Sequence, residues 1–139
     1  MSFPFPFHPV LVHFPIALFI SAFIMNLLGI ALKKDFLQQS AWHIFILAIS
    51  ITPLTVITGL MEENRLHFKH RILDLHKIFA LLTLGTSLIS FGLLWLIKRE
   101  NEKAFRALFL ITLLVIIIFV SLAGYFGGRM VYEYGAGVQ

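Results

Sequence analysis

Long apolar segments dominate the chain, and four of them are long enough to cross a bilayer as helices. About 20 apolar residues in helical conformation span the ~30 Å hydrocarbon core. Apolar and polar positions do not alternate with period two in these segments, so the pattern disfavours a transmembrane β-barrel. The predicted helices cover approximately residues 10–32, 41–61, 76–97 and 105–127, and residues 128–139 form a C-terminal tail.

The connections between the four segments are short, so consecutive helices run in opposite directions. We therefore expect an all-α fold: an integral membrane four-helix up-down bundle in one domain, with both termini on the same side. No Lys or Arg precedes the first segment, and it is too long for the apolar part of a signal peptide, so we expect it to be retained. Pro15 fits the first turn of this helix, where a missing N–H is no loss.

Composition supports a membrane location and removes several classes of function. The chain is 59% hydrophobic and 13% charged, whereas soluble domains carry roughly 25% charged residues. It contains no cysteine, which excludes disulfides, iron–sulfur clusters and covalent haem attachment through a Cys-x-x-Cys-His motif. The net charge of +4 is small and lies in short loops, so nucleic acid is not an expected partner.

The charges of the loops predict an orientation in the bilayer. The side without the termini carries six basic and three acidic residues, and the side with both termini carries five basic and four acidic residues. By the positive-inside rule, the first side faces the cytoplasm. We therefore expect a multi-pass protein of the bacterial inner (cytoplasmic) membrane, with its termini periplasmic, or outside.

Histidines gather on the side of the bundle that holds both termini. His13 begins the first helix and His76 begins the third, so their imidazoles enter the bilayer at similar depth. Two histidines on different helices can be the axial ligands of a b-type haem, and depth favours this pair. His8 is a shallower alternative to His13, and His70 to His76. Each residue could instead be an interfacial histidine bound to loop carbonyls and water. The five histidines on this side are His8, His13, His67, His70 and His76.

Small side chains follow the same half of all four predicted helices. They would leave room for the edge of a porphyrin, although small residues also let membrane helices pack closely without any cofactor. Along the first and third helices they are Ala17, Ser21, Ala80, Thr83, Ser87 and Ser90. Along the second and fourth they are Thr52, Thr55, Gly59, Ser121, Gly124 and Gly128.

Charged residues on this side offer two kinds of chemistry. Basic side chains can bind the carboxylates of a haem at the membrane edge, and the candidates are Arg65, Arg71, Lys77 and Arg129. Carboxylates can accept from an imidazole N–H and fix its tautomer, or can bind zinc or iron beside the histidines. The carboxylate candidates are Glu62, Glu63 and Asp74.

Motifs at both ends of the chain resemble a known family. They are His8-Pro9, Val12-His13-Phe14-Pro15 and the glycine-rich stretch Gly127–Val138. From about residue 7 to residue 138 the chain resembles the bacterial membrane proteins catalogued as domain of unknown function 2231. That family is similar in layout to small cytochrome b proteins, and a histidine heads its third helix, which corresponds to His76 or His70. The resemblance implies haem-linked electron transfer and an extracytoplasmic redox partner.

The glycine-rich stretch also predicts how the fourth helix ends. Gly127 and Gly128 have the backbone freedom that a helix end requires. The segment from Tyr132 to Val138 would then fold over the histidine side as a lid, with Arg129 near a haem carboxylate, or lie as an amphipathic tail at the interface.

The sequence therefore predicts a membrane protein that binds one b-type haem (protohaem) and passes electrons between a membrane donor such as quinol and an outer-face redox partner. It is an electron-transfer protein or subunit rather than a stand-alone enzyme. Two alternatives stay open. One is a zinc or iron ion bound by His8, His70, Asp74 and neighbouring groups. The other is a cofactor-free accessory subunit of a larger membrane complex, docked through its small-residue faces.

Overall fold

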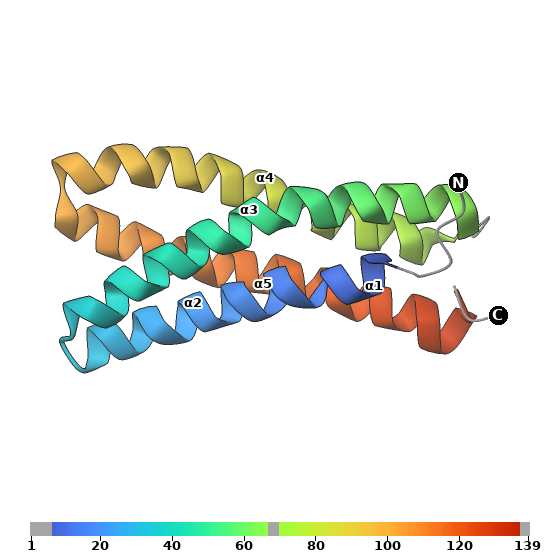
Figure 1. The fold of residues 1–139 in the computed structure, drawn as a ribbon, viewed down its shortest axis with the longest axis horizontal. Helices are drawn as coiled ribbons and strands as arrows, with labels where there is room; N and C mark the ends of the chain where they lie inside the picture. Colours follow the sequence, from blue (N-terminus) through green and yellow to red (C-terminus); the bar gives the residue numbers. More distant parts are fainter. Residues whose placement is uncertain (1–6, 67–69, 137–139) are drawn as a thin grey trace.

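A computed structural model describes residues 7–66 and 70–136, and these residues form five helices and no strand. The helices are α1 (Phe7–Leu11), α2 (His13–Ala31), α3 (Asp35–Leu66), α4 (Arg71–Glu100) and α5 (Glu102–Tyr134). Four stretches are long and apolar enough to cross a membrane, the first of which combines α1 and α2. The long helices alternate in direction, and α1 lies at the same end as the close of α5 (Figure 1). This confirms the predicted up-down helical architecture.

A proline interrupts the hydrogen-bond pattern of the first membrane segment near Val12, where the backbone stays helical (φ −60°, ψ −27°). Pro15 has no N–H, so the carbonyl of Leu11, four positions earlier, receives no helical hydrogen bond from it. Helix α1 ends at Leu11, and Pro15 lies in the first turn of α2, as predicted. Helices α1 and α2 therefore follow one continuous helical path, Phe7–Ala31, and His8 lies near its start.

The helices extend beyond their predicted bounds at several ends. Helix α3 begins at Asp35 instead of residue 41, and α4 begins at Arg71 instead of residue 76. The predicted end of the last helix at residue 127 was wrong, because α5 continues to Tyr134. The helix ends where Gly135 takes the left-handed conformation (φ 64°) and donates to the Val131 carbonyl at 3.0 Å. The tail predicted to begin at residue 128 is therefore mostly helical.

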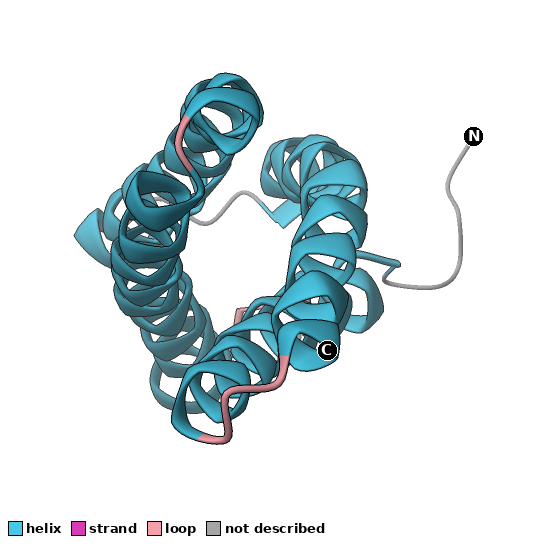
Figure 2. Ribbon diagram, turned by 90° about the vertical axis from the view of Figure 1, so that its left-hand side faces the viewer, coloured by secondary structure: helices cyan, strands magenta, loops and turns pink. Residues whose placement is uncertain are grey.

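The bundle consists of two helical hairpins. Helix α2 packs along α3, and α4 packs along α5, whereas contacts between the two pairs are fewer. Figure 2 looks along the bundle and shows the helices arranged around its centre. This arrangement leaves the boundary between the hairpins as the place where a ligand would disturb the least packing.

Aromatic side chains fill the boundary at the end opposite α1. Trp42 contacts Phe45, Phe105 and Phe109 with ring centroids 5.3–5.7 Å apart, the range of favourable aromatic pairs. Lys98 Nζ lies 4.9 Å from the centroid of the Trp42 ring and covers this cluster. The large rings come from α3 and α5, so they join the two hairpins and fix their spacing.

The end that carries α1 has a smaller buried cluster, formed by Ile72, Leu73 and Met130. Small side chains border the rest of the hairpin boundary there, as the next section describes. One end of the bundle is therefore closed by large rings, and the other end has space for a ligand.

We predict that Phe45→Ala destabilises the protein by roughly 3–5 kcal/mol, because the fully buried ring leaves a cavity in the aromatic cluster. Thermal unfolding in detergent, followed by circular dichroism, measures the effect. Phe36→Ala is the control, since that ring is 74% exposed and its loss should leave the unfolding temperature nearly unchanged. Equal effects of the two variants would contradict the assignment of the core.

Candidate functional site

A cavity of about 510 Å³ lies at the α1 end of the bundle, within the ~300–1,000 Å³ typical of ligand sites. Residues of α1, α2, α3, α4 and α5 line it, and three histidines are among them: His8, His13 and His76. A smaller cavity of about 70 Å³ adjoins it and also touches His8 and His76. Both cavities are lined mainly by apolar atoms.

The His8 ring is fixed by a hydrogen bond to another helix. Its Nδ1 lies 3.1 Å from the carbonyl oxygen of Thr55 in α3. A carbonyl can only accept, so Nδ1 carries the hydrogen and donates it. The neutral ring then has an unprotonated Nε2 with a free lone pair, which is the form that binds metals.

The His76 ring is held in the same way. Its Nδ1 donates to the carbonyl oxygen of Ala123 in α5 at 2.8 Å. Nε2 is again the unprotonated nitrogen. The two histidines thus present the same tautomer from opposite sides of the hairpin boundary.

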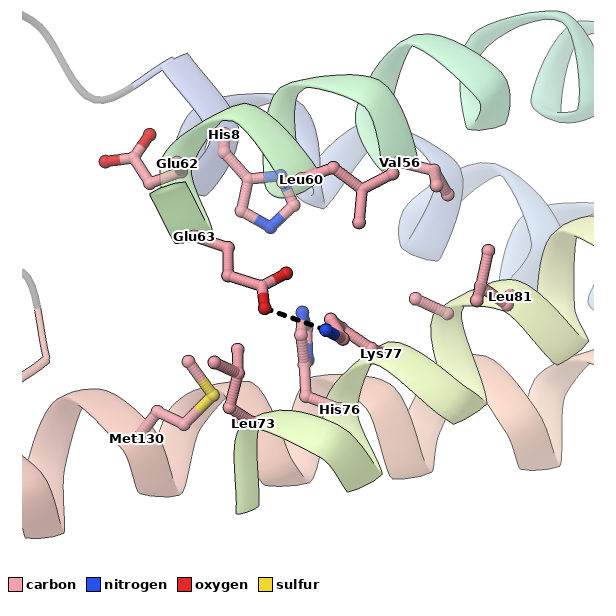
Figure 3. A pocket seen from close by; sticks show the side chains of 12 residues that line it. His8, Val56, Leu60, Glu62, Glu63, Leu73, His76, Lys77, Leu81 and Met130 are labelled. Carbon is pink, nitrogen blue, oxygen red and sulfur yellow. Dashed lines mark hydrogen bonds and ion pairs between the residues drawn. The ribbon is translucent and has the colours of Figure 1, made fainter. Parts of the chain in front are cut away.

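The two rings face one another across this boundary (Figure 3). Their centroids are 6.1 Å apart and their planes are 82° apart. A metal–imidazole bond measures about 2.0–2.1 Å. With one metal atom between the two Nε2 atoms, each ring centroid would lie one metal–nitrogen bond plus about half a ring width from the metal. Two such lengths in a straight line add up to a separation of about the observed size. The pair therefore has the spacing of two ligands that share one metal atom.

Two glycines make room for the rings. A Cβ atom at Gly59 would lie 2.7 Å from His8 Cε1, a distance that real Cβ contacts do not reach. At Gly127 it would lie 3.1 Å from His76 Nδ1. Each glycine stands four positions after the residue whose carbonyl accepts from the ring, so its missing side chain lets the imidazole reach that carbonyl.

The two docking arrangements are equivalent in sequence. In each, the histidine and the residue whose carbonyl accepts are 47 positions apart. A shift of 68 positions converts His8 into His76 and Gly59 into Gly127, and it also converts the end of α3 at Leu66 into the end of α5 at Tyr134. The histidines therefore occupy the same place in two hairpins of matching length.

The cavities meet at this histidine pair. A flat ligand between the rings would lie across the line that joins them and would extend into both cavities. The residues that both cavities share are His8, Val56, Glu62, His76, Ala80 and Met130.

The structure does not bring His13 and His76 together as the depth argument predicted. His13 is exposed, and its Nδ1 donates to the Pro9 carbonyl at 2.6 Å. It lines the larger cavity, but His8 is the more buried of the two and is the ring that faces His76. The two residues are five positions apart, about 140° around a helix, so when His8 faces α3 the His13 side chain points away from it.

His70 has a structural position. Its Nδ1 accepts from the backbone N–H of Ile72 at 3.2 Å and so caps the start of α4. Its ring lies 4.4 Å from that of Tyr134 at the end of α5. His70 lines neither cavity.

Of the predicted basic residues, Lys77 lies at the site. Its Nζ is 2.7 Å from Glu63 Oε1, and both side chains line the smaller cavity. Arg129 pairs instead with Glu133, with contacts of 2.7 and 2.5 Å. Arg71 is exposed and, like Arg129, lines neither cavity. Two other candidates, Arg65 and His67, lie outside the residues whose side chains are described.

The predicted zinc or iron cluster does not form in the described part of the chain. Among these residues, no three or more His, Cys, Asp or Glu side chains approach closely enough to hold a metal ion. His70 is occupied at the start of α4, and Asp74 is exposed and lines neither cavity.

Most of the predicted small residues of the second, third and fourth segments do border the cavities. Those that line one of them are Thr52, Thr55, Gly59, Ala80, Thr83, Gly124 and Gly128. Ala17, Ser21 and Ser121 are exposed instead, and Ser87 is buried in the packing. The lining residues missed at the sequence level include Ala123, whose carbonyl accepts from His76, and Gly127. The equal spacing from each histidine to its glycine was the signal that could have identified Gly127.

We predict that cysteines at positions 8 and 76 react with a short thiol-to-thiol cross-linker faster than other pairs do. The natural chain has no cysteine, so intact-mass spectrometry of the His8→Cys/His76→Cys variant has no background. His13→Cys/His76→Cys should react more slowly, and His43→Cys/His76→Cys should not react, because His43 lies near the start of α3 at the other end. Equal or faster reaction of the His13 variant would overturn the pairing.

Comparison with known proteins identifies the family. Searches of curated proteins and of solved structures found no match. A family model described as predicted membrane protein (DUF2231) matches residues 4–139, which is nearly the whole chain. The protein therefore belongs to the DUF2231 family of predicted membrane proteins.

Proposed function

We propose that this protein is a membrane haem protein that binds one b-type haem between His8 and His76. In this proposal it passes electrons between a membrane donor such as quinol and a redox partner at its outer face. The observation that carries the proposal is the imidazole pair, in which two unprotonated Nε2 atoms face the hairpin boundary from opposite sides with ring centroids 6.1 Å apart.

The surroundings of the pair fit a flat macrocycle. The two cavities extend on either side of the histidines, and their lining is mainly apolar. Small residues such as Ala80 and Gly124 border the larger cavity, where an aromatic side chain would fill the space. An apolar cleft suits a porphyrin, since the ring loses contact with water on binding.

The chain itself would fix the geometry of ligation. The carbonyls of Thr55 and Ala123 hold each Nδ1–H, which sets the tautomer and the direction of each ring. A haem iron with two imidazole ligands exchanges single electrons and has no open axial position for oxygen chemistry. The orientation predicted from the loop charges would place this end of the bundle at the outer face of the inner membrane, within reach of an extracytoplasmic partner.

We predict that the purified full-length protein shows a Soret band, with sharp α and β bands on reduction. His8→Ala and His76→Ala should each abolish or strongly shift this spectrum, because each removes one axial ligand. His13→Ala and His43→Ala should retain it. A preparation without bound haem that takes up none on titration would refute the proposal, and an unchanged spectrum in His8→Ala would refute the ligand assignment.

We also predict that glycine variants perturb the spectrum in a graded way. Gly59→Ala places a Cβ 2.7 Å from the His8 ring and should shift the bands or weaken haem binding by roughly tenfold or more. Gly127→Ala should have a smaller effect, since the contact there is 3.1 Å. Gly85→Ala is the matched control, because a Cβ there meets nothing within 4 Å. Equal spectra for all three variants would show that the glycines do not position the ligands.

A further inference from the structure

One pair of charges breaks the equivalence of the two hairpins. The shift of 68 positions that converts His8 into His76 also relates Lys77 to Pro9 and Glu63 to Val131. Lys77 and Glu63 line the smaller cavity, and Pro9 and Val131 line the larger one. The histidine pair therefore has an ion pair on one side and apolar residues in the corresponding place on the other.

The ion pair lies directly beside the ligand positions. Lys77 Nζ is 2.7 Å from Glu63 Oε1, and the two side chains are 33% and 27% exposed. Lys77 follows His76 in α4, while Glu63 comes from the end of α3. Figure 3 shows the pair crossing from one helix to the other next to the His76 ring. The Glu63 carboxylate thus already occupies the position that faces the Lys77 ammonium in the smaller cavity.

We infer that Lys77 is the carboxylate-binding group of this site, and that Glu63 holds the same position when no ligand is bound. The inference rests on the proposed function, because the ligand it implies is a tetrapyrrole with carboxylates on one edge. Protoporphyrin carries both of its propionates on one edge and only apolar substituents on the opposite edge. The edge with the propionates matches the side of the histidine pair that carries Lys77, and the apolar edge matches the side that carries Pro9 and Val131.

Exchange of the Glu63 carboxylate for a carboxylate of the ligand would keep the positive charge of Lys77 paired. One carboxylate replaces another at Lys77 Nζ, so the ammonium stays paired, and Glu63 turns toward the water at the end of the bundle. In the reverse orientation a propionate would lie against Pro9 and Val131. Both residues are exposed, so the propionate would keep water there but would gain no cation, whereas at Lys77 it would accept a charge-assisted hydrogen bond. The ion pair therefore selects one orientation of the ligand.

Titrations of the full-length protein with haem and with haem dimethyl ester test this inference. Lys77→Gln should weaken haem binding by roughly tenfold or more, since a hydrogen bond to a charged group is lost, and should leave ester binding unchanged. Lys77→Arg should restore the affinity for haem. Glu63→Gln removes the competing carboxylate, so it should tighten binding of haem relative to the ester.

The controls separate this inference from the proposed function. Lys103→Gln removes an exposed positive charge at the other end of the bundle and should alter neither affinity. If Lys77→Gln weakens haem and ester equally, or weakens neither, Lys77 does not bind the carboxylate and the inference fails while haem binding stands. If the wild-type protein binds neither compound, the proposed function fails and this inference fails with it.

Discussion

Each of two imidazoles gives its only N–H to a carbonyl of a neighbouring helix, and the candidate site depends on these two hydrogen bonds. The bond from His8 to Thr55 ties α1 to α3, and the bond from His76 to Ala123 ties α4 to α5. Both carbonyls belong to helices in which a glycine follows four positions later, and a Cβ at either glycine would crowd the ring, more severely at Gly59 than at Gly127. The same bonds leave both Nε2 atoms unprotonated and directed at the boundary between the hairpins. The same hydrogen bond from Nδ1 to a helix carbonyl, formed once in each hairpin, thus fixes where each ring lies, which tautomer it adopts and that the two rings face each other.

The rest of the bundle keeps that boundary open at one end only. Rings of Trp42, Phe45 and Phe109 join the hairpins at the far end and set their distance. Small residues occupy the corresponding positions near the histidines, so at the spacing set by the aromatic rings their side chains leave the boundary unfilled there. Since bilayer lipid is as apolar as the helix surfaces, packing and polar contacts hold membrane helices together. The aromatic cluster supplies the packing, and the histidine hydrogen bonds and the Glu63–Lys77 pair supply the polar contacts at the open end.

Hydropathy alone was enough to predict four helices long enough to span and an up-down order that puts both termini at one end of the bundle, because apolar length is a direct requirement of the bilayer. It also located most of the small residues around the cavity. It could not choose between His8 and His13, since distance along the sequence was taken as depth along one continuous helix. What separates them is the helix face, because five positions correspond to about 140° of rotation and only the His8 ring then meets α3 and His76. The end of α5 was misplaced for a related reason: Gly127 was interpreted as a helix end, whereas it provides space for a ring from another helix. Both errors came from contacts between segments that local patterns do not encode.

The assignment of one histidine to each hairpin has a consequence for the order of synthesis. The first hairpin, α1 to α3, is synthesised first and can dock its imidazole on Thr55 before the second hairpin is complete. His76 arrives with the second hairpin, which then docks it on Ala123 without help from the first. Each hairpin can therefore position its own histidine, and the histidine pair forms only when the two hairpins pack against each other in the membrane. A hairpin inserted without its counterpart has one of the two imidazoles and only part of the cavity lining.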